Sequence, residues 1–332
     1  MTKTTFIGAG AWNSALAKVL ADNGCDVLLY SIDPEQEEEI NRYHTNRKYI
    51  QDAMLPTSIT CTTDLEKAME QPEVIILGVP STAIRSAVSS FLPYLKNRPA
   101  LVNVAKGFDP VTFQGMTEML EGLIPKESLR GVVSLMGPSF AKEVVRGQNT
   151  AICAVGHDPL LNGEIQHLFS NDYFRVYTQD DVIGAEIGAG MKNIIAIASG
   201  ILTGLGYQNN SRAALITRGL AEITRFGLSK GAKEKTFLGL TGIGDLFLTC
   251  SSPTSRNFTA GYQIGQMDSA EEFMKNNKVT VEGIEASRLI YHEATKTGIS
   301  VPITQGVYQI LFGHAKPSEI CTQLMNRSLK AE

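Results

Sequence analysis

The chain has 332 residues, longer than most single domains, and its 43% hydrophobic and 19% charged residues are typical of a globular protein with a large core. The formal net charge is −4, with no basic stripe or Arg-rich arm, so we expect no nucleic-acid partner. A small acidic excess still permits an anionic substrate, because a local cluster of Lys and Arg side chains binds one inside an acidic protein.

The cysteine and histidine patterns indicate neither a disulfide framework nor a metal site. The five cysteines are widely scattered without a CxxC pair, and the five histidines share no spacing that suggests a metal site or a His-based triad. The chain begins with Met-Thr-Lys and an apolar strand, so we expect no signal peptide. No apolar run approaches the ~20 residues that span a bilayer. We therefore expect a protein of the reducing cytoplasm with no membrane span.

A glycine turn between an apolar strand and a helix opens the chain. A strand at residues 4–7 leads into Gly8-Ala9-Gly10-Ala11-Trp12-Asn13, followed by a helix at 14–23 and a second strand at 26–30. In this context Gly8 permits a tight turn, and Gly10 lets a pyrophosphate lie against the backbone at the helix N-terminus. Asn13 replaces the usual third glycine, so its side chain has to fit where helix and strand pack closely. The pattern predicts dinucleotide binding.

The end of the second strand leaves the choice between NAD and NADP open. Asp33 lies at about the distance of the acidic residue that binds the ribose hydroxyls in NAD sites, but it equally fits the N-cap of the next helix. No Arg stands beside it. Arg42, Arg47 and Lys48 follow in a polar segment that either reaches over the cofactor or forms a solvated face.

Further apolar strands alternate with helices and predict a doubly wound, mostly parallel sheet. We expect these strands at residues 73–79, 100–105, 131–136, 150–155 and 174–177. Lys106 follows one strand at the carboxyl end, where open α/β sheets bind ligands, or is an exposed loop lysine. Gly137-Pro138-Ser139 follows another strand. There we favour a glycine turn with Ser139 at a helix N-cap over an acyl-transfer serine, whose supporting motifs are absent.

The stretch from Gly184 to Gly206 holds one lysine, Lys192, among small and apolar residues. Apolar positions wrap most of the circumference from residue 189 onward, which predicts a buried helix. Gly200 and its small neighbours allow a backbone or a flat ligand to approach closely. Lys192 therefore requires a partner or a polar cleft, unless it snorkels to the surface at a helix end.

After Lys192 helical periodicity replaces the strand pattern, so we expect a Rossmann-type domain over residues 1–188 and an all-helical domain over 189–332. The helices of the second domain are expected at residues 212–228, 232–239, 257–265, 283–297, 304–312 and 317–327.

Three polar segments of the helical half are candidate site residues. Asp245 lies in a glycine-flanked, apolar turn at residues 240–246. Ser255 as N-cap and the Arg256 side chain together suit a phosphate oxyanion, or form an ordinary capped surface helix. Glu282 either caps the next helix, where its negative charge interacts favourably with the helix dipole, or contacts the cofactor.

End to end, these motifs resemble the NAD(P)-dependent glycerol-3-phosphate dehydrogenase family in its bacterial form. The resemblance rests on GAGAW at 8–12, VPS at 79–81, AKG at 105–107, GPSFAKE at 137–143, KN at 192–193, TRG at 217–219, GIGDL at 242–246, SRN at 255–257 and VEG at 281–283. It implies a Rossmann-type N-terminal domain and a helical C-terminal domain of the 6-phosphogluconate-dehydrogenase-like kind. It also implies reversible hydride transfer between NAD(P)H and dihydroxyacetone phosphate, which supplies sn-glycerol 3-phosphate for phospholipid synthesis.

By the same resemblance Lys192 is the catalytic proton acceptor. The residues around the phosphorylated substrate would be Lys106, Gly137, Ser139, Lys192, Asp245, Ser255, Arg256 and Asn257. The residues in contact with NAD or NADP would be Gly8, Gly10, Ala11, Trp12, Ile32, Lys106, Ala141, Arg256, Thr280 and Glu282. Ile32 stands where the family often has Arg or His, so we hypothesise a weaker preference for NADP than is usual. A homodimer through an apolar helical face stays open.

The chemistry suits these residues without the resemblance. When a secondary alcohol is oxidised, a hydride leaves carbon as a proton leaves oxygen, and a buried lysine accepts and returns that proton if burial and neighbouring cations favour its neutral form. We expect Lys192→Ala to lower kcat by roughly a hundredfold or more while the fold survives, since little else depends on the ammonium.

Two other functions remain as alternatives. A lysine-using hydroxyacid dehydrogenase of similar plan would want a carboxylate site in place of residues 255–257. A non-catalytic dinucleotide sensor would need no convergence of Lys106, Lys192 and Asp245.

Overall fold

The computed structural model describes residues 1–109, 112–277, 279–329 and 331. The chain divides into two compact units, Met1–Val182 and Ile183–Glu332. The domain boundary expected from the sequence, between residues 188 and 189, lies inside the long helix α9 (Val182–Gly204) and stays a prediction.

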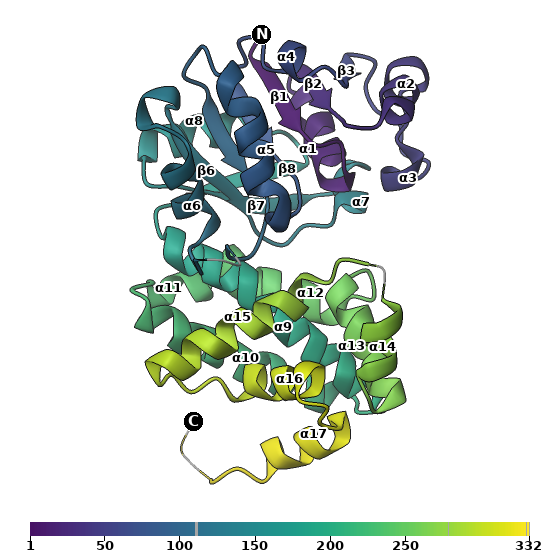
Figure 1. Cartoon of the computed structure of the whole chain (residues 1–332), viewed down its shortest axis with the longest axis vertical. Coiled ribbons are helices and arrows are strands. Elements are labelled where there is room, and N and C mark those ends of the chain that lie inside the picture. Colours follow the sequence, from purple (N-terminus) through teal and green to yellow (C-terminus); the bar gives the residue numbers. More distant parts are fainter. Residues whose placement is uncertain (110–111, 278, 330, 332) are drawn as a thin grey trace. The chain divides into compact units, whose positions relative to one another are not determined.

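The first unit is built on one eight-stranded sheet in the order β3-β2-β1-β4-β5-β6-β7-β8 (Figure 1). Every neighbouring pair is parallel except β6 and β7, so the predicted doubly wound, mostly parallel sheet is confirmed. The strands are β1 (Lys3–Ile7), β2 (Asp26–Tyr30), β3 (Ile59–Thr62), β4 (Val74–Leu77), β5 (Ala100–Asn103), β6 (Gly131–Met136), β7 (Thr150–Val155) and β8 (Phe174–Gln179).

The edge strand β3 is the one described strand that the sequence pattern did not reveal. Its four residues, Ile-Thr-Cys-Thr, include two threonines and form no apolar run. Its pairing with β2 therefore depends on the neighbouring strand more than on its own composition.

Helices cover the sheet, and alternate residues of its strands enter two separate apolar clusters. In β4, Val74 and Ile76 belong to one cluster and Ile75 and Leu77 to the other, as the two-residue period of a strand buried on both faces requires. The helices are α1 (Ala11–Asp22), α2 (Pro34–Tyr43), α3 (Arg47–Ile50), α4 (Leu65–Ala68), α5 (Ile84–Phe91), α6 (Met116–Leu123), α7 (Ala141–Val144) and α8 (Pro159–Phe169).

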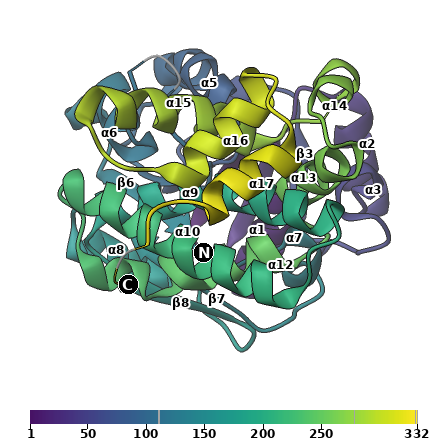
Figure 2. The same ribbon diagram turned by 90° about the horizontal axis from the view of Figure 1, so that it is seen from below.

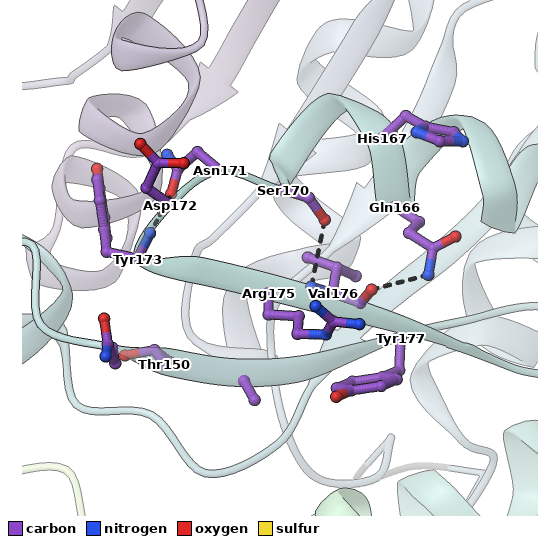
Figure 3. Close-up of a pocket in the computed structure, with 12 residues that line it drawn as sticks. Thr150, Gln166, His167, Ser170, Asn171, Asp172, Tyr173, Arg175, Val176 and Tyr177 are labelled. Atoms are coloured by element: carbon purple, nitrogen blue, oxygen red, sulfur yellow. Dashed lines mark hydrogen bonds between the residues drawn. The ribbon is translucent and has the colours of Figure 1, made fainter.

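The outer edge of β8 is closed by side chains from α8 and the turn that follows it (Figure 3). The Val176 amide donates to Ser170 Oγ at 3.3 Å, and Gln166 Nε2 donates to the Val176 carbonyl at 2.8 Å. Asn171 pairs with both backbone groups of Phe174. Free edge groups would template pairing with another chain, so these contacts block the edge at two residues.

The described residues of the second unit form helices and loops without a strand, as predicted (Figure 2). After α9 come α10 (Asn209–Ser229), α11 (Glu234–Phe237), α12 (Asp245–Ser251), α13 (Arg256–Met267), α14 (Glu271–Asn276), α15 (Glu282–Thr297), α16 (Pro302–Phe312) and α17 (Pro317–Met325). Residues 240–246, expected as a turn, contain a π-helical segment, Leu240–Gly244, that is kinked at Gly242 and runs directly into α12.

Helix α9 is the one helix in the described part of the chain long and apolar enough to cross a membrane, contrary to the expectation that no apolar run reaches this length. Its most apolar window is 83% buried inside the protein, so α9 is a core helix. Helix α13 approaches it closely. A Cβ on Gly200 would lie 2.0 Å from the Phe258 carbonyl oxygen, and one on Gly261 would lie 2.0 Å from that of Ile197. The group that approaches Gly200 closely is thus the backbone of α13, one of the two possibilities that the sequence left open.

Candidate active site

The glycine turn after β1 has the geometry that a dinucleotide requires. Gly8 adopts φ +98°, which residues with a Cβ rarely adopt, and its amide donates to the Tyr30 carbonyl at 3.0 Å. Gly10 is the N-cap of α1, which begins at Ala11 and not at residue 14 as expected. The N-cap glycine has no side chain to cap this N-terminus, and an uncapped helix N-terminus suits an anion such as a pyrophosphate.

The side chain at the third position of the fingerprint fits without opening the turn. Asn13 is 1% exposed, and its Nδ2 donates to the carbonyl oxygens of Ile7 at 3.1 Å and Gly8 at 2.7 Å. The departure from the glycine pattern is therefore absorbed by hydrogen bonds within the turn.

At the end of β2 the structure supports the capping interpretation of Asp33. Its Oδ1 accepts a hydrogen bond from the Glu35 amide at 3.1 Å, at the N-terminus of α2. Ile32 projects into solvent with 88% of its surface exposed. Arg42 pairs on its own helix with Glu38, as in a solvated face.

Lys106, Gly137 and Ser139 converge at the carboxyl ends of β5 and β6. Lys106 Nζ and Ser139 Oγ both donate to the Gly137 carbonyl, at 3.4 and 3.2 Å. The expectation that Ser139 caps the next helix is wrong. The N-cap of α7 is Phe140 and Ala141 opens the helix, because the Ser139 hydroxyl turns back to Gly137.

In the second unit Lys192 does not snorkel. It is 6% exposed, and its Nζ donates to Asp245 Oδ1 and to Thr249 Oγ1, each at 2.7 Å. Thr249 Oγ1 in turn donates to the Asp245 carbonyl at 2.6 Å. The ammonium is thus held by a carboxylate and a hydroxyl that are themselves 1% and 5% exposed.

Thr249 is a site residue that the sequence reasoning missed. It lies four residues after Asp245 on α12, the spacing that brings two side chains to one face of a helix. The predicted turn over residues 240–246 does not imply this helical spacing, because it excludes Asp245 from the helix that carries Thr249.

A second polar cluster joins the N-termini of α13 and α15 to α9. Ser255 Oγ caps α13 by accepting from the Phe258 amide at 3.3 Å. Asn257 donates to Asn193 Oδ1 at 3.0 Å and accepts from the Gly283 amide at 2.9 Å. Asn193, which follows the lysine on α9, donates to Glu282 Oε2 at 3.2 Å.

Arg256 stands at the exposed margin of this cluster. Its side chain is 58% exposed, and its guanidinium lies 3.8 Å from Glu282 Oε1. Glu282 opens α15 in its first turn, and Thr280 lies exposed in the preceding loop. An exposed Arg beside a capped helix N-terminus suits a phosphate oxyanion.

The buried thiol beside the lysine is not a reactive group. Burial raises the pKa of Cys250 far above its ordinary value, although the nearby Lys192 charge acts in the opposite direction. A neutral thiol is a poor nucleophile.

Comparison with known proteins agrees with this geometry. The N-terminal model of NAD-dependent glycerol-3-phosphate dehydrogenase matches residues 3–161, and the C-terminal model matches residues 181–322. A glycerol-3-phosphate dehydrogenase (NAD(P)+) of Staphylococcus epidermidis is 45% identical, and one of Staphylococcus aureus is 44% identical, each over all of both chains.

A solved structure shows the same two-domain architecture. The crystal structure of glycerol-3-phosphate dehydrogenase from Coxiella burnetii is 31% identical, with a TM-score of 0.88 over 98% of this chain and 99% of that one. The chain therefore belongs to the NAD-dependent glycerol-3-phosphate dehydrogenase family and is an NAD(P)-dependent oxidoreductase.

Proposed function

We propose that this chain catalyses reversible hydride transfer between NAD(P)H and dihydroxyacetone phosphate, with Lys192 exchanging the proton. The observation that carries the proposal is the buried lysine, fixed by Asp245 and Thr249, in a member of this family. When bound, the nicotinamide cofactor supplies or accepts the hydride. The open N-terminus of α1 and the positive φ of Gly8 fit its pyrophosphate.

Lys192 donates a proton to the carbonyl oxygen during reduction and takes it back during oxidation. Asp245 balances the ammonium charge and Thr249 fixes its orientation, so the proton is held at one defined atom, Nζ. A positioned acid of this kind contributes roughly a hundredfold to ten-thousandfold in rate.

The phosphate of the substrate serves as a handle remote from the reacting carbon. We assign it to Arg256 and the Ser255-capped N-terminus of α13, with Lys106, Gly137, Ser139 and Asn257 completing the substrate contacts. Binding energy realised at such a remote group orients the carbonyl for hydride transfer. The cofactor is assigned to Gly8, Gly10, Ala11, Trp12, Ile32, Lys106, Ala141, Arg256, Thr280 and Glu282.

The biological setting is part of the same proposal. We infer that the reaction runs toward glycerol 3-phosphate for phospholipid synthesis in the cytoplasm, as the resemblance to bacterial family members implies. Accumulation of glycerol 3-phosphate in cells with the active enzyme, and its loss when the gene is deleted, would test this direction. Size-exclusion chromatography tests whether the protein is a homodimer.

The experiment that tests the activity follows absorbance at the nicotinamide band with dihydroxyacetone phosphate, using NADH and NADPH in parallel. Rapid oxidation of either cofactor supports the proposal, and the ratio of catalytic efficiencies shows the preference. We expect NADH to be used at least as well, because Ile32 offers no cation to a 2′-phosphate, and Ile32→Arg should shift the ratio toward NADPH. A folded protein that oxidises neither cofactor would contradict the proposal and direct attention to hydroxyacid substrates.

A further inference from the structure

We propose that Asn13 and Gly78 form a matched pair that fixes two turns of the cofactor site relative to each other, which makes Asn13 a positioning residue for NAD(P) binding. The inference rests on the proposed function for the place of the cofactor, but its own basis is the packing of these two residues.

Hydrogen bonds from one amide join the two turns. Asn13 Nδ2 donates to the carbonyl oxygens of Ile7 and Gly8 in the first turn, at 3.1 and 2.7 Å, and reaches that of Gly78 at 3.4 Å. Gly78 directly follows β4, the strand that pairs with β1, and its own amide donates to the Ile7 carbonyl at 3.2 Å. Both turns therefore stand at the carboxyl edge of adjacent parallel strands, where open α/β sheets bind ligands.

The Asn13 side chain fills the space that a side chain on Gly78 would occupy. A Cβ added to Gly78 would lie 1.8 Å from Asn13 Oδ1 and 2.4 Å from Asn13 Cγ. The Asn13 side chain cannot simply swing away to relieve this overlap, because it is 1% exposed and its amide is hydrogen-bonded to backbone carbonyl groups. A third glycine in the fingerprint usually lets the helix pack closely against the strands. Here Asn13 occupies that position of the helix, and Gly78, after β4, leaves room for its side chain.

The unpaired end of the amide shows what the side chain contributes. Asn13 Oδ1 is buried without a hydrogen-bond partner within the described residues. A buried acceptor without a partner opposes folding, so this oxygen adds nothing to the stability of the turn. The donor contacts to the turns are the remaining contribution of this side chain.

The chain carries its own probe of this turn. Trp12 is its one tryptophan, half-buried, and precedes Asn13 at the start of α1. Its fluorescence therefore reports NADH binding at the turn without any turnover of substrate.

The test is a double-mutant cycle read by Trp12 fluorescence during NADH titration and by thermal unfolding. Asn13→Gly should weaken NADH binding about tenfold, and Gly78→Ala should weaken it further or prevent folding. The double variant Asn13→Gly/Gly78→Ala should fold and bind NADH more tightly than either single variant. If Gly78→Ala does not fold, restored folding in the double variant supports the pair. A double variant as defective as the two single changes combined would overturn it.

A same-shape variant separates hydrogen bonding from packing. Asn13→Asp keeps the shape but faces the carbonyl oxygens with no N–H donor, so we expect weaker NADH binding, with the KM for NADH rising more than kcat changes. Wild-type affinity in Asn13→Asp would overturn the positioning role. Gly163→Ala, on α8 with nothing within 4 Å of the added Cβ, is the control and should bind NADH normally.

The outcomes distinguish this inference from the proposed function. A wild-type protein that binds NADH but does not turn over dihydroxyacetone phosphate contradicts the proposed function alone. If the wild-type protein turns over dihydroxyacetone phosphate normally but the effects of Asn13→Gly and Gly78→Ala simply add in the double variant, only the proposed pair is contradicted. A wild-type protein that binds neither NADH nor NADPH would overturn the pair as a part of the cofactor site.

Discussion

At the residue scale, the functional groups of the helical unit are defined by the partners that hold them. Lys192 is buried against Asp245 and Thr249, whereas Arg256 is more than half exposed and lies near Glu282. A buried, paired cation is held in one position, and an exposed one is available to an incoming anion. This difference supports the proposal that the lysine exchanges the proton and the arginine binds the phosphate.

We predict that Lys192→Ala lowers kcat by about a hundredfold or more, as the loss of a positioned acid–base group implies. The variant also removes the ammonium partner of Asp245, which is 1% exposed, so unfolding should become easier by about 3–5 kcal/mol. This corrects the expectation that little depends on the ammonium. Steady-state kinetics and urea unfolding measure the two effects.

The matched control is Lys192→Ala/Asp245→Asn, which removes the buried charge as well. It should recover part of the lost stability and none of the turnover. Recovered turnover in the double variant would remove Lys192 from the mechanism.

For Arg256 we predict an effect on substrate affinity. Arg256→Ala should raise the KM for dihydroxyacetone phosphate about tenfold or more, the worth of a charge-assisted hydrogen bond, with a smaller effect on kcat. Arg288→Ala is the control, because Arg288 is also partly exposed and paired with a carboxylate, Glu285, on α15. An unchanged KM in Arg256→Ala would show that the phosphate binds elsewhere.

At the element scale, the helical unit is held by close helix contacts and by a cap that one helix supplies to another. Helices α9 and α13 cross with Gly200 and Gly204 on one side and Gly261 and Gly265 on the other. Each of these glycines faces a backbone carbonyl or amide where a Cβ would stand. Because of this close crossing, α13, whose N-terminus Ser255 caps, packs directly against α9, the helix that carries Lys192.

We predict that Gly261→Ala destabilises the protein strongly, because the new Cβ would lie 2.0 Å from the Ile197 carbonyl oxygen. Overpacking of this kind costs about 1–3 kcal/mol or more. Gly163→Ala on α8 should instead stabilise by about 0.5–1 kcal/mol, since the same change meets no atom there. Chemical unfolding of both variants compares them, and equal effects would refute the close crossing.

The N-terminus of α16 lacks a side-chain cap of its own and receives one from α10. Glu222, 1% exposed, accepts from the amides of Ile303 at 2.8 Å and Thr304 at 2.9 Å, and from Thr304 Oγ1 at 2.7 Å. These contacts satisfy orphan N–H groups of the helix. Glu222 thus ties two helices of the second unit together.

We predict that Glu222→Gln lowers the free energy of unfolding by about 1–3 kcal/mol, because an amide N–H would face the backbone donors. Glu285→Gln on the surface should have little effect. Burial raises the pKa of Glu222, while the hydrogen bonds from Thr304 and Ile303 and the Arg225 charge lower it.

The pH dependence follows from that direction. A carboxyl whose pKa is raised by folding contributes its full stability below its unfolded-state pKa and loses it as pH rises through the folded-state pKa. The advantage of wild type over Glu222→Gln should therefore shrink as pH rises above the ordinary carboxyl range. Urea unfolding of both proteins across this range measures it, and an advantage that grows with pH would contradict the raised pKa.

At the scale of the whole molecule, the chain consists of a unit built on a mostly parallel sheet and a unit built of helices. The first unit provides the glycine turn and the carboxyl edge of the sheet, and the second provides the lysine and its partners. The apolar helix α9 is the core of the second unit, with 83% of its most apolar window buried.

We predict that the protein stays in the supernatant after high-speed centrifugation of a lysate without detergent. A helix whose apolar surface is already buried in protein has little left to bury in lipid. Immunoblots of the supernatant and the washed membrane pellet measure this, with a known integral membrane protein as the control. Recovery in the pellet would contradict the core-helix interpretation.

Patterns local in the sequence predicted much of the fold. The apolar runs placed β1, β2, β6 and β7 at their observed residues or within one of them, and the helical periodicity placed α15 and α16 nearly as well. The glycine turn and the buried lysine were recognised from their immediate neighbours. The short strand β3 was not recognised, because it depends on pairing with β2. The start of α12 and the Ser139 hydroxyl also differ from the prediction, and the hydroxyl does so through a local contact, with the Gly137 carbonyl two residues before it.

By itself, the sequence determined the two kinds of domain, the dinucleotide turn and the family, because periodicity and ordered motifs depend on residues near one another in the chain. The tertiary structure alone decided the partners of those residues. Thr249 meets Lys192 across 57 residues, Gly78 meets Asn13 across 65, and Glu222 caps α16 across 81. Such contacts depend on how strands pair and helices cross. Patterns within one segment of the sequence do not show which distant segment will pack against it.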